Sequence, residues 1–205
     1  MEAGAGVRFG RALAAATPVF SVHQPDDPGR GEVEAFIRCV YADHFGARVR
    51  QFAPTLVSLR EGGVITAAAG YRSGVQPLFL EHYLDGPVER LLAGPGERLP
   101  RERIFEVGHL AALQPGEGRR LIPFLARHLE QLQVQWVVST ATQELRRIFT
   151  RLGVKPITLG AADPARLGAG AVDWGRYYDH RPLVLAGRLP VTLRSAAPRR
   201  AAVGE

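Results

Sequence analysis

The alternation of strand-like and helix-like segments along the chain is the feature that most limits its fold. Short runs of β-branched and aromatic residues, typical of strands, alternate with segments whose apolar residues recur every three or four positions, as in amphipathic helices. From the N-terminus the order is strand, helix, two strands, short helix, strand, helix, strand, helix and two strands. This order predicts an α/β (α+β) fold, in which a single mixed β-sheet is flanked by helices on both faces.

The boundaries of these segments follow from apolar periodicity and from turn residues. The expected strands cover 17–23, 54–60, 64–72, 104–113, 134–140, 154–159 and 181–187, and the expected helices cover 32–45, 87–92, 118–133 and 143–152. Thr142 is suited to cap the last of these helices, because threonine side chains accept hydrogen bonds from free helical amides. We expect one domain over 17–193, with a flexible segment at 1–16 and a disordered tail at 194–205.

Chain length and composition are sufficient for a hydrophobic core. The chain has 205 residues, of which 46% are hydrophobic and 22% charged, so it needs no disulfide or structural metal. Its one cysteine, Cys39, excludes an intramolecular disulfide and any CxxC motif, and we expect it to be a buried small hydrophobe.

The formal net charge of +6 raises the question of a polyanionic partner. However, Lys155 is the only lysine and the arginines are scattered, so we expect no nucleic acid partner. No segment approaches the roughly 18 apolar residues of a membrane span. The apolar run near the N-terminus is interrupted by Pro18 and no cleavage site follows, so we expect a cytoplasmic protein.

Five segments of the chain resemble the thermostable hemolysin family. They are FAPTL at 52–56, LFLEHYLD at 78–85, EVGHLA at 106–111, WVVSTAT at 136–142 and WGRYY at 174–178. The order of elements is also similar to that of the GCN5-related N-acetyltransferase fold, which acyl-homoserine-lactone synthases share. The resemblance therefore implies an acyltransferase-like domain.

Three functions are compatible with this resemblance. In the first, the protein moves an acyl group from a coenzyme A or acyl-carrier-protein pantetheine thioester to a small amine acceptor, without a metal. In the second, suggested by the family name, the protein is membrane-active, although the chain lacks a long basic amphipathic helix. In the third, the fold is kept as a binding module that has lost its cofactor turn.

In this fold the pyrophosphate of the donor sits on a glycine-containing turn that enters the central helix, where free amides and the helix dipole favour anions. The segment 115–120 (PGEGRR) occupies that place. Leu113 stands where glutamine or arginine is usual and Glu117 is a poor neighbour for phosphate, so a merely glycine-rich turn is the alternative. The resemblance assigns donor binding to Leu110, Ala112, Gly116, Gly118, Arg119, Arg120 and Thr140.

Two residues of the strand before this turn are candidates for catalysis. Glu106 stands where the base of this fold often lies, and burial would raise its pKa into a useful range. The alternative is a structural ion pair with Arg72 or Arg103. Strict alternation separates Glu106 from His109, but a bulge at Gly108 would bring both to one face; the alternative is a core histidine.

The region between the hairpin and the short helix commonly forms the acceptor side of the cleft in such enzymes. Glu81 could hold a cationic acceptor, with Tyr83 beside it. Aromatic residues at 174–178 lie on an expected loop and either line the cleft or cap the core. The candidate substrate-binding residues are Arg72, Glu81, Tyr83, Trp174 and Tyr177.

Overall fold

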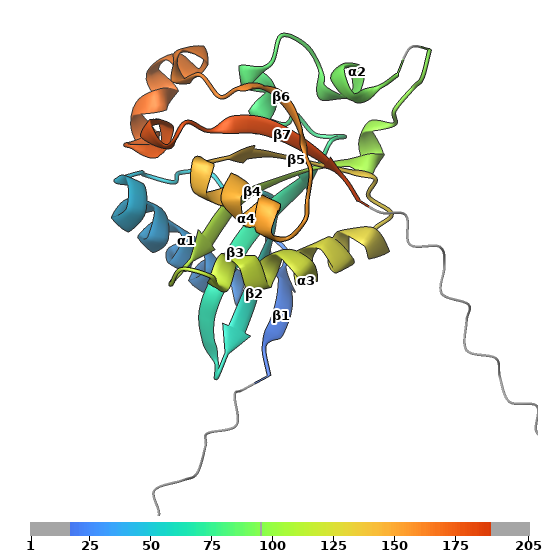
Figure 1. Cartoon of the computed structure of the whole chain (residues 1–205). Helices are drawn as coiled ribbons and strands as arrows, with labels where there is room; N and C mark the ends of the chain where they lie inside the picture. The colour runs from blue at the N-terminus through green and yellow to red at the C-terminus, as the bar shows by residue number, and fades with distance from the viewer. Residues whose placement is uncertain (1–16, 95, 190–205) are drawn as a thin grey trace, which may run out of the picture.

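All the strands of the computed structural model lie in one mixed sheet, as the sequence pattern predicts. The structure describes residues 17–94 and 96–189, so the two expected terminal segments, 1–16 and 194–205, lie outside the described residues. Residues 190–193, which were assigned to the domain, lie outside them as well. Within that range seven strands pair in the order β1-β2-β3-β4-β5-β7-β6 (Figure 1).

The sheet consists of two parts joined at its middle. Four strands pair antiparallel in sequence order: β1 (Val19–His23), β2 (Thr55–Glu61), β3 (Val64–Ser73) and β4 (Ile104–Ala112). On the far side, β7 (Leu183–Arg188) pairs antiparallel with both β5 (Trp136–Ala141) and β6 (Ile157–Ala161). The two parts meet where β5 runs parallel to β4.

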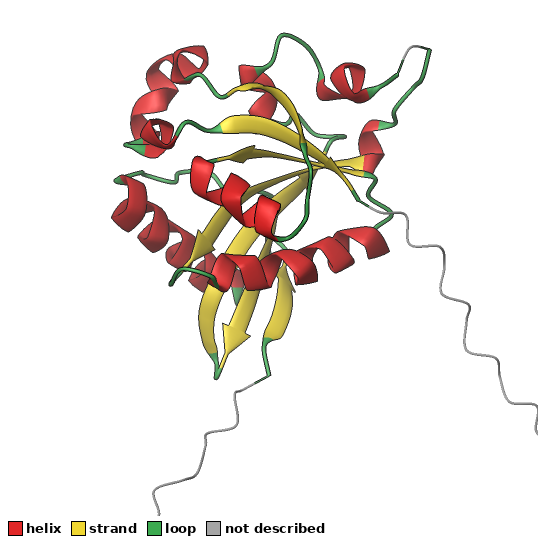
Figure 2. Ribbon diagram, viewed as in Figure 1, coloured by secondary structure: helices red, strands yellow, loops and turns green. Residues whose placement is uncertain are grey.

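Helices cover both faces of the sheet (Figures 1 and 2). Helix α1 (Arg30–Phe45) packs against Leu56, Ala68 and Ala111 on one face. Helix α3 (Glu117–Gln131) packs its leucines against the opposite face of β2 and β3. Helix α4 (Gln143–Arg151) lies beside the start of α3 and begins at Thr142, whose hydroxyl accepts the Leu145 amide at 3.3 Å, as expected.

Short helical segments fill the connections on the α1 side of the sheet. They are η1 (Phe79–Tyr83), α2 (Val88–Leu92), η2 (Arg101–Arg103), η3 (Pro164–Trp174) and η4 (Tyr177–His180). Only α2 has a counterpart in the sequence prediction; η3 and η4 lie in a segment that was expected to be a loop. None of the helices in the described ranges is long and apolar enough to cross a bilayer.

Several sequence expectations are wrong in detail. Strand β6 begins at Ile157 and not at 154, and Pro156, which has no amide hydrogen for a ladder, immediately precedes it. The helix expected over 118–133 ends at Gln131, and Leu132 just beyond it is 45% exposed. Cys39, expected to be buried, is exposed on α1.

Strands β4 and β5 diverge after a short parallel pairing. Their register covers three residue pairs, from Ile104 opposite Trp136 to Glu106 opposite Val138. Beyond Glu106, β4 continues to Ala112 beside β3, whereas β5 continues to Ala141 beside β7. The sheet therefore opens into a V whose point lies at Glu106.

The loop after η3 is fixed to the end of α1. The Arg176 amide donates to the Phe45 carbonyl at 2.7 Å, and the Arg48 amide donates to the Asp173 carbonyl at 2.6 Å. Gly175 lies between them with φ 53° and ψ −125°, and a Cβ there would lie 2.3 Å from the Phe45 oxygen. This close approach requires glycine.

We expect Gly175→Ala to destabilise the protein much more than Gly168→Ala. Gly168 has nearly the same backbone angles, φ 55° and ψ −130°, but open space around its Cβ position. Both variants carry the backbone strain of about 1–3 kcal/mol, and only Gly175→Ala adds an overlap with backbone. Urea unfolding measures both; equal losses of stability would contradict the close approach.

Candidate active site

The Glu106 carboxylate is buried at the point of the V. One oxygen accepts the Phe79 amide at 2.7 Å and the other accepts the Leu80 amide at 3.0 Å. The residue is 7% exposed. Burial raises the pKa of Glu106 above its ordinary value, although the amide of Phe79, the charge of Arg72 and the amide of Leu80 oppose the shift. Glu106 thus combines a structural role with a perturbed pKa.

Arg72 lies directly opposite Glu106 on β3, so the two side chains share a face of the sheet. The distance from Arg72 Nε to Glu106 Oε2 is 3.6 Å. Of the two arginines considered from the sequence as partners of Glu106, Arg72 is the one that pairs with it. Arg103 is exposed at the end of η2, and no ion pair between Arg103 and Glu106 is found among the described residues.

A bulge in β4 brings His109 to the face of Glu106. The β3–β4 register shifts between Ala68 and Gly70, and His109 has a left-handed φ of 52°. Its ring contacts those of Tyr41 and Phe52, on the α1 side of the sheet. Burial lowers the pKa of His109 to about 4, and the positive charge of Arg72 contributes. The imidazole is therefore neutral at neutral pH.

The face of β4 beside Glu106 is open at the Cβ position of Gly108. A Cβ at Gly108 would have no atom within 4 Å, whereas a Cβ at Gly70, directly opposite, would lie 2.9 Å from both Ala53 and Leu56 side-chain carbons. Space therefore exists next to Glu106 along β4, but not across the strand pair.

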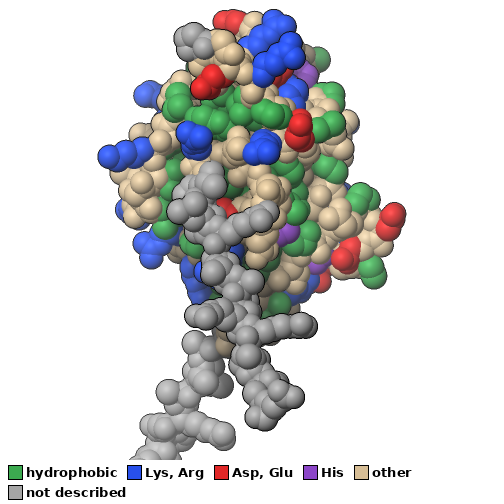
Figure 3. Space-filling model, turned by 90° about the vertical axis from the view of Figure 1, so that its right-hand side faces the viewer, with side chains coloured by type: hydrophobic (Ala, Val, Ile, Leu, Met, Phe, Trp, Pro, Cys, Tyr) green, Lys and Arg blue, Asp and Glu red, His purple; other side chains and the backbone are tan. Residues whose placement is uncertain are grey.

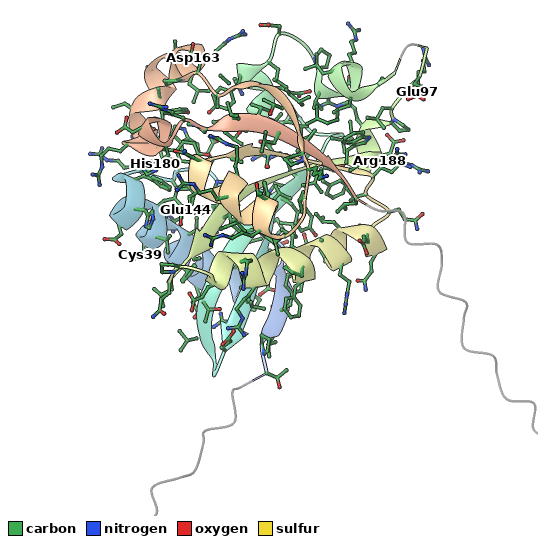
Figure 4. All side chains as sticks on the ribbon, viewed as in Figure 1. Cys39, Glu97, Glu144, Asp163, His180 and Arg188 are labelled. Carbon is green, nitrogen blue, oxygen red and sulfur yellow. The ribbon has the colours of Figure 1, made fainter. Side chains whose placement is uncertain are left out.

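The turn between β4 and α3 presents helix amides beside a cluster of arginines. Gly116 precedes α3 with φ 100° and no side chain caps this helix. A pocket of about 390 Å³ opens here; it is lined by Pro115, Gly116, Arg119, Gln143, Glu144, Arg147, Ile148, Arg151 and His180. Figure 4 labels two of these residues, Glu144 at the start of α4 and His180 on η4. Three arginines against one glutamate in the lining favour an anion.

The two adjacent arginines of the turn differ in position. Arg119 lines the pocket, whereas Arg120 Nη1 lies 2.5 Å from Glu61 Oε1 in the β2–β3 hairpin. Gly118 is buried, and a Cβ there would lie 3.6 Å from the Ala112 side chain and 4.0 Å from that of Leu110. Leu110, Ala112 and Gly118 thus pack together, while Arg120 belongs to a different surface.

Glu81 is already bound within the protein. Arg101 donates to both of its oxygens, at 2.7 and 3.0 Å, and Val88 and Leu78 donate backbone amides. Although burial raises the pKa of Glu81, these hydrogen bonds lower it below its ordinary value. A cationic acceptor would have to compete with Arg101. The Tyr83 hydroxyl lies 2.7 Å from that of Tyr178, and burial raises the pKa of Tyr83.

An aromatic cluster covers the same face of the sheet. The Trp174 ring lies 5.5 Å from those of both Phe79 and Tyr177. The Tyr177 hydroxyl donates to the Thr140 carbonyl at 3.1 Å, two residues beyond the last β4–β5 pair. The Thr140 hydroxyl is buried and has no hydrogen-bond partner among the described residues. Trp174 and Tyr177 therefore pack over the sheet near the V.

Three residues that line the pocket were not expected from the sequence: Arg147, Arg151 and His180. Arg147 and Arg151 are four positions apart on α4, so they share a helix face. That spacing was a usable signal. His180 lies on η4, far away in sequence, and no local pattern indicates that it approaches α4.

Comparison with known families gives one match, to a family described as thermostable hemolysin, over residues 23–193. The chain belongs to the thermostable hemolysin family. The resemblance stated from the five sequence segments is thus confirmed. A search of curated proteins finds no significant match for this hemolysin-family chain.

Solved structures similar to this chain include two synthases and one acetyltransferase domain. The AHL synthase LasI has a TM-score of 0.59 at 15% identity, covering 85% of this chain and 91% of that one. FeeM, an N-acyl amino acid synthase from uncultured soil microbes, has a TM-score of 0.56 at 19% identity, with 85% and 92% covered. The Tetrahymena GCN5 histone acetyltransferase domain has a TM-score of 0.51 at 11% identity, with 89% and 99% covered. The expected acetyltransferase-like fold is therefore confirmed.

We expect Glu106→Gln to reduce the free energy of unfolding by about 1–3 kcal/mol, because the new amide group must face one of two backbone donors. Glu102→Gln, at an exposed residue of η2, is the matched control and should change stability little. Equal stability of Glu106→Gln and wild type in urea would exclude the structural role of the carboxylate.

The pKa of His109 makes stability depend on pH. This pKa falls from an ordinary 6.5 to about 4 on folding. Between these two pH values the unfolded chain therefore binds a proton at His109 that the folded chain does not bind. Stability should fall by up to about 3 kcal/mol as pH drops from 6.5 to 4. His109→Asn, which tolerates left-handed backbone, should lose this part of the slope, and the exposed His44→Asn should keep it. Identical slopes for all three proteins would contradict the shift.

Proposed function

We propose that this protein transfers an acyl group from a pantetheine thioester, carried by coenzyme A or by an acyl carrier protein, to the amine of a small acceptor. The observation that carries the proposal is the V between β4 and β5, whose point lies at a buried carboxylate with a raised pKa. An extended pantetheine arm can enter such an opening and form hydrogen bonds with strand backbone that has no neighbouring strand.

Glu106 acts as the general base in this proposal. Each oxygen accepts one amide and has a second lone pair for a further donor. A raised pKa suits a group that takes a proton from an amine as the amine attacks the thioester carbonyl. His109 has a pKa of about 4, so it contributes a neutral polar ring and no proton transfer at neutral pH.

The phosphate of the donor would bind at the mouth of the V. The free amides at the start of α3, the left-handed turn at Gly116 and the Arg119 side chain favour a negative group there. The bulge at His109 displaces backbone from the β3–β4 ladder, and a freed amide can stabilise the thioester oxygen as negative charge develops. The buried Thr140 hydroxyl, on the opposite arm of the V, is a further donor group.

Both donors share the phosphopantetheine group, and the residues around the turn include some that favour several phosphates and some that disfavour them. Arg147 and Arg151 favour additional negative charge, whereas Glu144 in the same pocket disfavours it. Glu117 Oε2 accepts a hydrogen bond from the Gln114 amide at 2.8 Å, so one carboxylate oxygen is already bound within the turn itself. Because coenzyme A and acyl carrier proteins are cytoplasmic, we place the activity in the cytoplasm.

We expect Arg119→Gln to weaken binding of the thioester donor by about tenfold, as expected for losing one charged hydrogen bond. Arg120→Gln is the matched control, because the neighbouring arginine pairs with Glu61 outside the pocket. Calorimetry with octanoyl-CoA and with octanoyl acyl carrier protein measures both variants. Equal loss in the two variants, or in neither, would contradict donor binding at this turn.

A further inference from the structure

The Arg72 guanidinium group, beside Glu106, has N–H donors without close hydrogen-bond partners in the described structure. Its side chain is 24% exposed, and its contacts in the described structure are Glu106 Oε2 at 3.6 Å and the Pro77 carbonyl at 3.5 Å. Both are long, and a guanidinium group has five N–H donors. Arg72 can therefore accept a further, closer anionic partner without losing a tight internal bond.

The carboxylates near this face have partners of their own, which argues against a cationic ligand. Glu81 is held by Arg101 and by two backbone amides. Other carboxylates of the segments that cover this face are also paired, Glu89 with Arg101, Asp85 with Arg166 and Asp173 with Arg50. A ligand arriving beside Glu106 therefore meets a cation whose donors are not all used, whereas these carboxylates already have cationic partners.

The space for a ligand lies next to both groups. Gly108 is on the same face as Glu106, two residues further along β4, and its Cβ position is open. On the β3 side there is no such space, since the Cβ position of Gly70 is filled by Ala53 and Leu56. A molecule above Gly108 therefore has Glu106 and Arg72 together at one end.

We propose that the acceptor is an α-amino acid, whose carboxylate pairs with Arg72 while its amine faces Glu106. One carbon separates the amine and the carboxylate of an α-amino acid, and the Arg72 and Glu106 side chains are correspondingly adjacent, 3.6 Å apart. A zwitterion of this shape is complementary to the pair, because each of its charges meets the opposite one. This inference rests on the proposed acyl transfer and specifies its substrate class.

The transfer step balances with these groups alone. The acceptor ammonium gives one proton to Glu106 and becomes a nucleophilic amine. Its nitrogen then attacks the thioester carbonyl carbon, the C–N bond forms and the C–S bond breaks. The sulfur leaves with its electron pair and takes the second proton of the amine as a thiol, and Glu106 returns its proton to solvent. The products are an N-acyl amino acid and the free thiol.

The test compares each amino acid with the amine that lacks only its carboxylate. With octanoyl-CoA and octanoyl acyl carrier protein as donors, thiol release and product mass are measured for tyrosine against tyramine and leucine against isoamylamine. We expect kcat/KM to favour the amino acids by at least about tenfold. Arg72→Gln should abolish the preference, Arg72→Lys should retain part of it, and the exposed Arg188→Gln should keep it.

Two failures can be told apart. Acylation of the amines as fast as of the amino acids overturns the acceptor assignment and leaves acyl transfer standing. Absence of transfer to every acceptor from either donor overturns the proposed function.

A binding measurement on the products tests the acceptor assignment without turnover. Wild type should bind N-octanoyl-tyrosine at least about tenfold more tightly than N-octanoyl-tyramine, and Arg72→Gln should bind both equally. Equal binding by wild type would refute the carboxylate contact.

Discussion

The contact between the Glu106 carboxylate and the Phe79 and Leu80 amides joins the central strand to the segment that covers it. Through this contact a buried charge obtains two hydrogen-bond donors, and η1 is fixed above the sheet with Leu80 and Tyr83 in the core. The same contact lies where β4 leaves β5. Burial of an ionised group is tolerated only when it is well bonded, so packing and chemistry at this point cannot be separated.

Much of the fold could be predicted from the sequence because its elements carry strong local patterns. The β2–β3 hairpin, the α1 and α3 helices and the Thr142 cap depend on neighbouring residues, and each is found close to its expected place. The η segments could not be predicted in the same way. They are held by contacts between residues far apart in sequence, such as Arg101 with Glu81 and Arg176 with Phe45.

The residues of the candidate site also differ in how far the sequence could predict them. The resemblance to the acetyltransferase fold indicated Glu106. The glycine at 108 suggested a bulge at that residue, but Gly108 pairs regularly with Gly70, and the irregularity that brings His109 to the face of Glu106 begins one residue later. The partners of the charged residues could not be predicted in this way. Arg119 and Arg120 are indistinguishable in sequence, but Arg119 lines the pocket and Arg120 pairs with Glu61. Glu81 appeared available for a ligand until its long-range partner Arg101 was known.

The width of the V between β4 and β5 is fixed beyond its point as well as at its point. Tyr177 holds the end of β5 through the Thr140 carbonyl, and the adjoining Arg176 is bonded to the end of α1, which itself packs on β3 and β4. Strand, loop and helix thus form a triangular frame with three fixed corners. A frame of this kind resists widening, so in the proposed acyl transfer the acyl chain would have to fit the interior that the aromatic cluster leaves. Chain length would then be selected by the shape of a rigid opening and not by an adaptable one.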